Sequence, residues 1–384
     1  MERILLGPGP SLTPPSVQAA MVRPPLGHMD PDLMPILEET AVLLRRVFQT
    51  ANEVAFPLSG TGTAGMEACL VNTLARGDRI IVAASGFFAQ RIAEIAGRLG
   101  ADVAVVEAPW GQAVDPADVV RALRARPVKV VAAAHVETST GVLQPLRELA
   151  AAVREHGALM LVDAVASLGG VELAVDAWGI DVCYSGSQKC LSAPPGMAPL
   201  TANEPARARS REGAVPSFYM DLELIWRYWA PPHAYHHTVS VPLVFAMHEA
   251  LRLVAAEGLP ARWARHATNA SAFASGIEAM GLRLFAPRAV RSPTVITVVV
   301  PEGVDEARVR QRLLAEYGIE IAGGLGPLRG KIWRIGLMGH SSQDRLVLLL
   351  LAALEAVLAA EGAPVDRGAG MAAASRVLAA SSAA

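Results

Sequence analysis

The sequence predicts an α/β fold, in which a mostly parallel sheet is covered by helices on both faces and is followed by a smaller α+β domain. Between Val54 and Tyr184, short apolar runs alternate with helical patterns of about ten to fifteen residues, as in successive βαβ units. The chain of 384 residues also exceeds the size at which a single core keeps growing. We therefore expect two domains.

The chain opens with Gly7-Pro-Gly-Pro10 and Pro14-Pro15, which predict an extended arm because proline fixes φ and lacks an N–H donor. A helical pattern follows over Met34–Gln49, and then the alternation begins. The predicted strands are Val54–Leu58, Arg79–Ala84, Asp102–Glu107, Val128–His135, Ala158–Asp163 and Ile180–Tyr184. The predicted helices between them are Gly62–Leu74, Phe87–Leu99, Asp115–Arg124 and Leu143–His156.

A long helical pattern at Val239–Glu257 ends at Gly258 and Pro260, which predicts a domain boundary. The smaller domain is expected to hold helices at Arg262–Met280, Asp305–Tyr317 and Asp344–Ala360, and strands at Val295–Val300 and around Glu320 and Ile332. Past Gly362 the composition turns to alanine, serine and glycine, so we expect a poorly ordered or merely appended tail. The predicted divisions are an N-terminal arm (1–20), a large domain (21–258), a small domain (259–362) and a tail (363–384).

Composition and charge exclude several classes of protein. No apolar run reaches the roughly 18 residues of a membrane-spanning helix, and the apolar N-terminal stretch is too short for a signal peptide. A net charge of −2 without a basic cluster argues against nucleic acid or anionic membranes as partners. Cys69, Cys183 and Cys190 are too few for a disulfide framework or a zinc site, so they should be reduced and buried. We expect a cytoplasmic protein that acts on small metabolites.

Lys189 lies on a turn of small residues, Ser185-Gly-Ser-Gln-Lys189, directly after a short apolar strand. The chain has 34 basic residues, of which only Lys129, Lys189 and Lys331 are lysines, so a lysine at this place indicates a need for that side chain. Desolvation can deprotonate a lysine, which then attacks a carbonyl to form a Schiff base. The alternative is an ordinary solvated or ion-paired lysine.

The segment Ser59-Gly-Thr-Gly-Thr-Ala-Gly65 joins a predicted strand to a predicted helix. Backbone amides and the hydroxyls of Thr61 and Thr63 would gather at the helix N-terminus, where a phosphate is favoured. The spacing also matches a dinucleotide fingerprint, but the next strand ends in Ser85-Gly-Phe-Phe88 without the acidic residue that binds ribose. A monophosphate site is the preferred interpretation, and a glycine-rich turn without a ligand is the alternative.

Three further residues each have two interpretations. Asp163 ends an apolar strand, so its carboxylate either needs a cationic partner, such as a protonated pyridine nitrogen, or caps a following helix. Phe88 is either a core residue or a flat surface for a planar ring. Arg334, in an apolar strand, either binds a carboxylate through its planar fork or forms a structural salt bridge.

Two polar segments complete the pattern. His135-Val-Glu-Thr138-Ser-Thr-Gly141 supplies hydroxyls after a strand, and Tyr235-His-His-Thr238 is a polar aromatic cluster before a long helix. The two adjacent histidine rings should diverge, so a metal site is not favoured there.

Together these motifs resemble the class V group of pyridoxal phosphate enzymes, and more narrowly the alanine–glyoxylate and serine–pyruvate aminotransferases. The resemblance extends from about Leu5 to Leu337. It rests on Gly7-Pro-Gly-Pro10, Ser59-Gly-Thr-Gly62, Glu137-Thr-Ser-Thr-Gly-Val-Leu-Gln-Pro145, Val162-Asp-Ala-Val-Ala-Ser-Leu-Gly169, Tyr184-Ser-Gly-Ser-Gln-Lys-Cys190, Tyr235-His-His-Thr238 and Gly323-Gly-Leu-Gly326.

The resemblance implies a fold-type I enzyme with a mostly parallel seven-stranded sheet, a pyridoxal 5'-phosphate cofactor and a homodimer with shared active sites. In such an enzyme Lys189 would hold the cofactor through a Schiff base and carry protons, and Asp163 would pair with the pyridinium nitrogen. The other implied contacts are Phe88 and Val165 on the two ring faces, Thr61, Gly62, Thr63 and Gln188 on the phosphate, Tyr235 and Thr238 reaching that phosphate from the neighbouring subunit, Thr138 at the cofactor or substrate, and Gly9 and Arg334 at the substrate, with Arg334 on its α-carboxylate.

The implied activity is transamination between alanine or serine and glyoxylate or pyruvate, in two half-reactions through pyridoxamine phosphate. The sequence has Thr63 and Phe88 where some relatives carry histidine and tryptophan. Alternatives on the same fold are a pyridoxamine–pyruvate or aminophosphonate transaminase, a lyase and a cysteine desulfurase. A desulfurase needs a mobile, exposed cysteine, usually in the second domain, whereas all three cysteines precede residue 191. An NAD oxidoreductase lacks its ribose carboxylate, and a cofactor-free binding protein would not need both Asp163 and Lys189.

Overall fold

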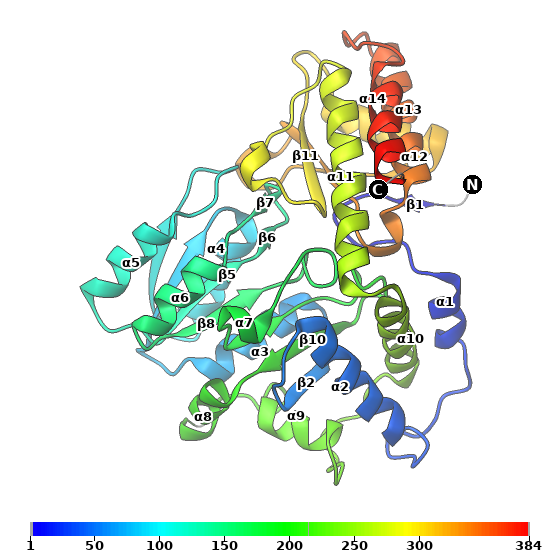
Figure 1. Cartoon of the computed structure of the whole chain (residues 1–384). Coiled ribbons are helices and arrows are strands. Elements are labelled where there is room, and N and C mark those ends of the chain that lie inside the picture. The colour runs from blue at the N-terminus through cyan, green and yellow to red at the C-terminus, as the bar shows by residue number, and fades with distance from the viewer. Residues whose placement is uncertain (1–2, 214, 383–384) are drawn as a thin grey trace.

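The computed structural model describes residues 3–213 and 215–382, and a seven-stranded sheet lies at its centre (Figure 1). The strand order is β2-β10-β9-β8-β5-β3-β4. These strands are β2 (Val54–Ser59), β3 (Arg79–Ala84), β4 (Asp102–Glu107), β5 (Val130–Ala134), β8 (Leu159–Asp163), β9 (Val182–Tyr184) and β10 (Met197–Ala202). Strand β10 pairs antiparallel with both β2 and β9, and all the other pairings are parallel, which confirms the mostly parallel sheet.

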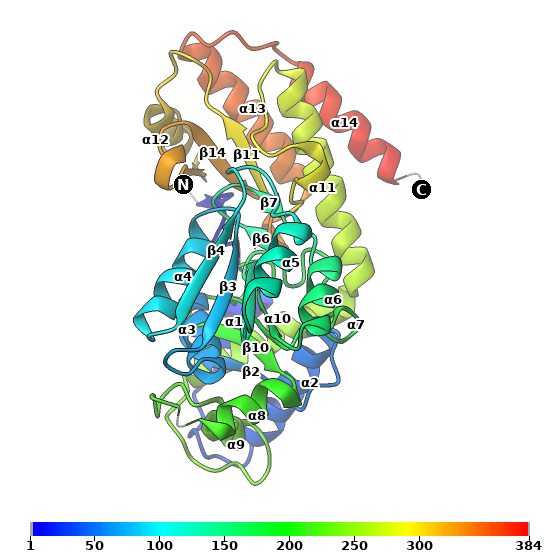
Figure 2. The same ribbon diagram turned by 90° about the vertical axis from the view of Figure 1, so that its left-hand side faces the viewer.

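Helices cover both faces of this sheet. Figure 2 shows α3 (Gly62–Thr73) and α4 (Phe87–Arg98) on one side of the strands, and α5 (Pro116–Ala125) and α6 (Arg147–Glu155) on the other. The remaining helices of this part are α1 (Pro15–Met21), α2 (Met34–Phe48), α7 (Val175–Trp178), α8 (Glu204–Glu212), α9 (Leu222–Trp229) and α10 (Val241–Glu257). None of the helices in the described part of the chain combines the length and apolar character needed to span a bilayer.

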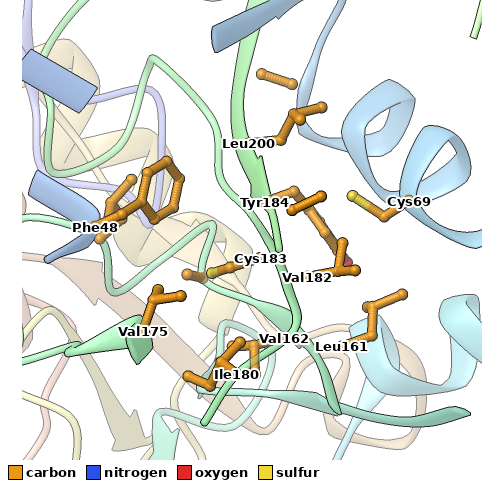
Figure 3. Close-up of a cluster of buried hydrophobic side chains, with 14 of the residues drawn as sticks. Phe48, Cys69, Leu161, Val162, Val175, Ile180, Val182, Cys183, Tyr184 and Leu200 are labelled. Carbon is orange, nitrogen blue, oxygen red and sulfur yellow. The ribbon is translucent and has the colours of Figure 1, made fainter. Parts of the chain in front are cut away.

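The side chains on both faces of the sheet are mainly apolar, as expected for strands covered by helices on each side. Figure 3 shows Val162 of β8, Cys183 of β9 and Cys69 of α3 within this layer. All three cysteines are free and buried, as predicted from their number and spacing.

The strand β10 was not predicted from the sequence pattern. It contains Pro199, and proline normally argues against a central strand because it cannot donate to the ladder. In the sheet Pro199 lies opposite Pro57 of β2, while its carbonyl accepts a hydrogen bond from the Ser185 N–H (2.7 Å). The strand therefore tolerates proline while it still pairs with both neighbours.

A second apolar cluster lies beyond α10 and contains the expected mixture of helices and short strands. Its elements are α11 (Leu259–Ala279), β11 (Val295–Val299), α12 (Glu306–Tyr317), β12 (Ile319–Glu320), β13 (Ala322–Gly323), β14 (Ile332–Gly336) and α13 (Asp344–Ala360). Strands β11, β14 and β13 form an antiparallel sheet in that order. We propose a domain boundary near Gly258, because it lies between the two clusters.

Both ends of the chain are more ordered than the sequence indicated. The prediction that the N-terminal arm is extended throughout is wrong. Strand β1 (Ile4–Leu5) pairs in parallel with β12, and helix α1 begins at Pro15. Proline is well suited to the first helical turn, where its missing N–H has no partner to lose. The prediction of a poorly ordered or merely appended tail is also wrong, because helix α14 (Ala369–Ser382) packs on α11 and α13 and buries Ala374 completely.

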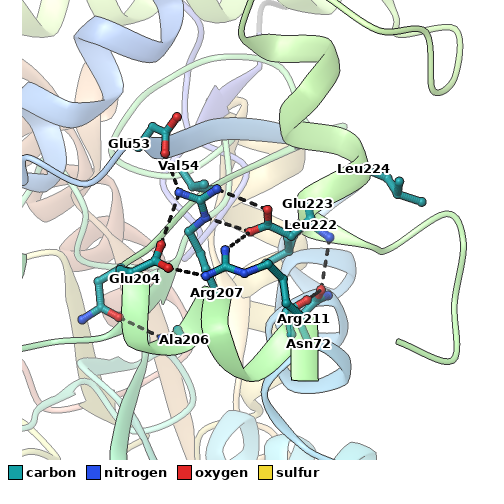
Figure 4. A network of polar contacts seen from close by, with 12 residues as sticks. Glu53, Val54, Asn72, Glu204, Ala206, Arg207, Arg211, Leu222, Glu223 and Leu224 are labelled. Atoms are coloured by element: carbon teal, nitrogen blue, oxygen red, sulfur yellow. Dashed lines mark hydrogen bonds and ion pairs between the residues drawn. The ribbon is translucent and has the colours of Figure 1, made fainter. Parts of the chain in front are cut away.

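The outer edge of the large sheet is held by a network of arginines and carboxylates on α8 and α9 (Figure 4). Arg207 donates to Glu223 (2.7 Å) and to Glu53 (2.5 Å), and Arg211 bonds Glu204. The guanidinium of Arg207 therefore connects α8 with α9 and with the segment before the edge strand β2.

The packing of α14 makes a testable prediction. Replacing the buried Ala374 with arginine should lower the free energy of unfolding by about 2–4 kcal/mol, because a charge would enter an apolar cluster. Ala372, exposed on the same helix, provides the control Ala372→Arg, which should change stability by less than about 0.5 kcal/mol. Denaturant unfolding measures both, and equal stabilities for the two variants would show that α14 is not part of the cooperative fold.

Candidate active site

The ends of several parallel strands meet at one edge of the large sheet, which is where ligands of such folds bind. Asp163 is the last residue of β8 and is 4% exposed. Its Oδ1 accepts a hydrogen bond from the Val165 N–H (2.8 Å). Burial raises the pKa of Asp163 to about 6. No helix begins directly after this residue, so the helix-cap interpretation is wrong.

Lys189 follows β9 on the next turn of this edge. Its Nζ donates a hydrogen bond to the Pro8 carbonyl. Burial, helped by the positive charge of Arg334, lowers the pKa of Lys189 to about 8, against the opposing effect of Asp163. Lys189 forms no ion pair within the described residues. The interpretation of this residue as a solvated or ion-paired surface lysine is therefore wrong.

The N-terminal segment lies directly on this lysine. The Ser11 N–H donates to the Gln188 carbonyl, and its hydroxyl donates to the Lys189 carbonyl, both at 2.8 Å. At Gly9, where φ is 120°, a Cβ would lie 2.7 Å from the Cδ of Lys189. Only glycine allows the backbone to approach the lysine side chain this closely.

The glycine-rich turn before α3 approaches the same strand ends. Gly60 has a φ of 144° and donates to the Gly196 carbonyl (2.9 Å), and Thr61 is the N-cap residue without a side-chain cap. A Cβ at Gly62 would lie 3.0 Å from Cγ2 of Val165, so this helix N-terminus lies beside the turn that follows Asp163. The exposed Thr63 accepts a hydrogen bond from Arg91 (3.2 Å). The first amides of α3 therefore face this edge of the sheet.

Phe88 is half-buried at the start of α4 and is not part of either large apolar cluster, so the core interpretation is wrong. Its ring meets that of Phe87 edge to face, with centroids 5.6 Å apart. The Arg91 guanidinium lies 5.1 Å from the Phe88 ring centroid. Arg91, which the sequence pattern did not single out, thus contacts both Phe88 and Thr63.

Glu137 is a second residue that sequence reasoning missed. It belongs to β6 (Val136–Glu137), is fully buried and accepts hydrogen bonds from the Phe88 and Ala89 amides (3.1 Å each). It also accepts from the Ser139 hydroxyl (2.6 Å). A carboxylate at the N-terminus of α4 is favoured by the helix dipole and by its unpaired amides. Glu137 therefore fixes the helix turn that carries Phe88.

Arg334 enters the site from β14 of the smaller sheet and is 8% exposed. Its Nε donates to the Gly323 carbonyl (2.7 Å) and its Nη1 to the Thr138 carbonyl (3.3 Å). It forms no ion pair within residues 3–213 and 215–382, so the salt-bridge interpretation is wrong for this part of the chain. Burial lowers the pKa of Arg334 to about 10, and the Glu137 charge opposes that shift. The guanidinium keeps donors free for an anion.

The structure thus brings Gly9, Thr138, Asp163, Lys189 and Arg334 to one region. Gln188 adjoins it, and its buried Oε1 has no hydrogen-bond partner among the described residues. Because buried polar atoms are normally paired, this amide oxygen is open to a hydrogen-bond donor from a ligand. The amine, the free guanidinium, the buried carboxyl and the open helix N-terminus fit an aldehyde-bearing, phosphorylated pyridine.

Tyr235 and Thr238 are not brought to the glycine-rich turn of their own chain. Both are exposed, and the Tyr235 ring lies 5.2 Å from that of His28. The residue that does reach the turn is His237, whose Nε2 lies 2.8 Å from the Ser59 hydroxyl. The sequence singled out this segment but assigned its histidines no role, and the prediction that their rings diverge is wrong, because the two Nδ1 atoms lie 2.7 Å apart.

Two rival activities lose support here. The thiols of Cys69, Cys183 and Cys190 are buried, and burial raises the pKa of Cys190 to about 12, so none offers an exposed thiolate. The strand β3 ends at Ala84 before Ser85 and Gly86, without the acid of a dinucleotide site.

Comparison with known proteins places these features in one family. Residues 10–331 match the family model described as Aminotransferase class-V. The chain is 42% identical to the (S)-ureidoglycine–glyoxylate transaminase of Bacillus subtilis (strain 168), over 95% of this chain and 93% of the relative. It is 39% identical to the alanine–glyoxylate aminotransferase of Drosophila melanogaster, over 92% and 91% of the two chains.

Solved structures agree with the sequence comparisons. The crystal structure of the ureidoglycine–glyoxylate aminotransferase from Bacillus subtilis superposes with a TM-score of 0.96 at 43% identity, covering 98% of each chain. That of a pyridoxamine–pyruvate aminotransferase from Mesorhizobium loti gives a TM-score of 0.94 at 32% identity, covering 99% of this chain and 98% of the other.

The raised pKa of Asp163 predicts how stability depends on pH. Above pH about 6 the ionised carboxyl destabilises the folded apo protein. This penalty shrinks as the pH falls and disappears below the ordinary pKa of 3.8, where folded and unfolded chains are both protonated. Asp163→Asn keeps the acceptor for Val165 and should stabilise the apo protein by about 1–3 kcal/mol at pH 8. Denaturant unfolding at several pH values checks this. An advantage that grows on acidification would contradict it.

Proposed function

The chain belongs to the class V aminotransferases, and we propose that it carries an amino group from a small amino acid to glyoxylate. One observation supports this above the others: the buried amine of Lys189 lies within reach of the charges of both Asp163 and Arg334. Both relatives named above are described as glyoxylate transaminases. The family and the site chemistry together imply pyridoxal phosphate as the cofactor.

The residues that would hold this cofactor lie at the strand ends. Asp163 would pair with the ring nitrogen, and a carboxyl whose pKa is raised by burial gains most from a cationic partner. Phe88 and Val165 would contact the ring faces. The contacts proposed for the phosphate are the amides and hydroxyls at Thr61, Gly62 and Thr63, together with Gln188. When bound, pyridoxal phosphate supplies an aldehyde that takes up the amino group and a ring that accepts the electron pair left at Cα.

Lys189 would attach the cofactor and move the proton. Since its pKa is lowered to about 8, about a tenth of its Nζ is unprotonated at pH 7, far more than for an ordinary lysine. That neutral amine can act as a nucleophile, and it can take a proton from the substrate Cα and return it to another atom. The Pro8 carbonyl accepts from Nζ and so orients the amine.

Arg334 would bind the α-carboxylate shared by amino acid and 2-oxo acid. Its Nε is held by Gly323 and its Nη1 by the Thr138 carbonyl, which fixes the plane of the guanidinium. A planar fork in a fixed orientation suits a bidentate carboxylate. Gly9 lies against the Lys189 side chain and Thr138 lies beside Arg334, so both would adjoin the substrate.

We also propose that the active unit is a cytoplasmic homodimer with shared sites. Tyr235 is 61% exposed, and the exposed aromatics Phe218 and Tyr219 contact the next residue, His236; exposed aromatic groups of this kind mark interfaces. Tyr235 and Thr238 of one subunit would then reach the phosphate turn of the other.

Several compounds are candidates for the amino donor. Alanine and (S)-ureidoglycine are named for the two relatives, serine–pyruvate exchange is implied by the sequence resemblance, and pyridoxamine is named for one structural neighbour. A half-reaction screen decides between them. Purified holoenzyme is mixed with each donor separately while the visible absorbance band of the bound cofactor is followed, and one amino donor should bleach it at least about tenfold faster than the others. A band that only pyridoxamine discharges would overturn the proposed amino acid donor.

The same screen tests Lys189. Lys189→Ala should lose both the visible band and turnover, because no other lysine among the described residues contacts Asp163 or Arg334. The exposed Lys331 gives the matched control Lys331→Ala, which should keep both. Undiminished turnover in Lys189→Ala would remove this residue from the reaction.

Arg334→Lys should raise the KM for amino acid and 2-oxo acid alike, by about 100-fold, since an ammonium replaces two charge-assisted hydrogen bonds with one. Arg329→Lys, at an exposed position, is the control and should leave both constants unchanged. Steady-state kinetics with each substrate varied in turn measure the effect. Unchanged KM values for both substrates would exclude Arg334 from carboxylate binding.

A further inference from the structure

Two adjacent histidines connect the glycine-rich turn to an exposed loop. His237 Nε2 lies 2.8 Å from the Ser59 hydroxyl, and the two Nδ1 atoms of His236 and His237 lie 2.7 Å apart. His236 Nε2 lies 3.0 Å from the Phe218 carbonyl oxygen. These contacts form one continuous chain of hydrogen bonds, from Ser59 at the end of β2 to Phe218, which is 70% exposed.

The direction of this chain follows from its chemistry. The Phe218 carbonyl can only accept, so His236 Nε2 must carry a proton. In a neutral His236, Nδ1 is then an acceptor and the Nδ1–H of His237 donates to it. A neutral His237 protonated at Nδ1 leaves Nε2 as an acceptor, so the Ser59 hydroxyl donates its proton there. The donor and acceptor roles in each hydrogen bond are thus determined by those in the hydrogen bond before it.

Both rings are largely shielded from solvent. His236 is 8% exposed and its ring stacks on that of Phe218, with centroids 4.8 Å apart and planes 16° from parallel. His237 is half-buried, and burial lowers the pKa of His237 to about 4. All four ring nitrogens are engaged, so the pair offers no lone pair to a metal ion.

This chain of hydrogen bonds has a consequence for the turn. Ser59 precedes Gly60 and pairs with Met197 in the sheet, and its hydroxyl uses its single proton on His237. It therefore cannot also donate to an anion at the turn. The donors left for an anion are the backbone amides of α3 and the exposed hydroxyls of Thr61 and Thr63.

We propose that His237 is a positioning residue for the phosphate turn, with its tautomer set by His236, and that it couples this turn to the exposed segment at Phe218. The proposal rests on the proposed function in one respect, that the turn binds the cofactor's phosphate. His237 touches neither substrate nor cofactor in this account. It acts by holding Ser59, and through Ser59 the backbone that leads into α3.

The tautomers can be observed directly in the apo protein. Histidine side-chain ¹⁵N NMR at pH 8 should show His236 protonated at Nε2 and His237 at Nδ1, with the signals assigned by their loss in His236→Gln and His237→Gln. The tautomers are read from the wild-type spectrum, so this test does not depend on whether the variants fold. His237 protonated at Nε2, or either ring as a cation at pH 8, would overturn the proposal.

Binding measurements test the positioning role itself. His237→Phe should weaken binding of pyridoxal phosphate to the apo protein by about tenfold, and of phosphate-free pyridoxal by less than about twofold. His237→Gln, whose amide oxygen can still accept from Ser59, should recover most of the affinity. The control is His156→Phe, since His156 is exposed and bonds only a carbonyl of its own helix.

The alternative outcomes are distinct. Equal losses for pyridoxal phosphate and pyridoxal in His237→Phe, or no loss at all, would overturn the positioning role. Effects of Ser59→Ala and His237→Phe that simply add would also overturn it, because two residues acting through one hydrogen bond should not be additive. A wild-type protein that binds neither compound would instead refute the cofactor assignment and leave the tautomer result standing.

Discussion

The burial of two oppositely charged groups at one edge of the sheet constrains the surrounding structure. Asp163 ends β8, and Lys189 lies on the turn after the neighbouring parallel strand β9; burial raises the pKa of the carboxyl to about 6 and lowers that of the amine to about 8. Neither group takes part in an ion pair within the described residues. The apo chain therefore keeps an energetic cost at this edge, as expected where stability has been exchanged for chemistry. A cationic ring that carries an aldehyde would relieve both parts of that cost.

The surrounding elements cover this edge of the sheet and orient the side chains on it. The N-terminal segment crosses the lysine through Pro8 and Gly9, and Arg334 arrives from the smaller sheet. Glu137 fixes the helix start that carries Phe88, while His237 holds the turn before α3. Each of these contacts joins segments distant in sequence, so the site depends on how the two apolar clusters are brought together.

Several of these features could be predicted from local patterns. Asp163 and Lys189 follow apolar strands, and the strand period and the turn residues after it are local properties. Glu137 could not be identified in this way, because its role lies in amides contributed by residues 88 and 89. Pro199 concealed β10, and the alanine-rich composition concealed the packing of α14, whose burial depends on α11 and α13.

The sequence by itself determined the alternation of strands and helices, and with it which residues lie at the carboxyl edge of the sheet, because side-chain period and turn chemistry are short-range. Only the tertiary structure decided the protonation of those residues and their partners. Desolvation and hydrogen bonding depend on groups far along the chain, such as the Pro8 carbonyl, 181 residues from Lys189. The choice between a solvated lysine and a reactive amine was therefore made by packing.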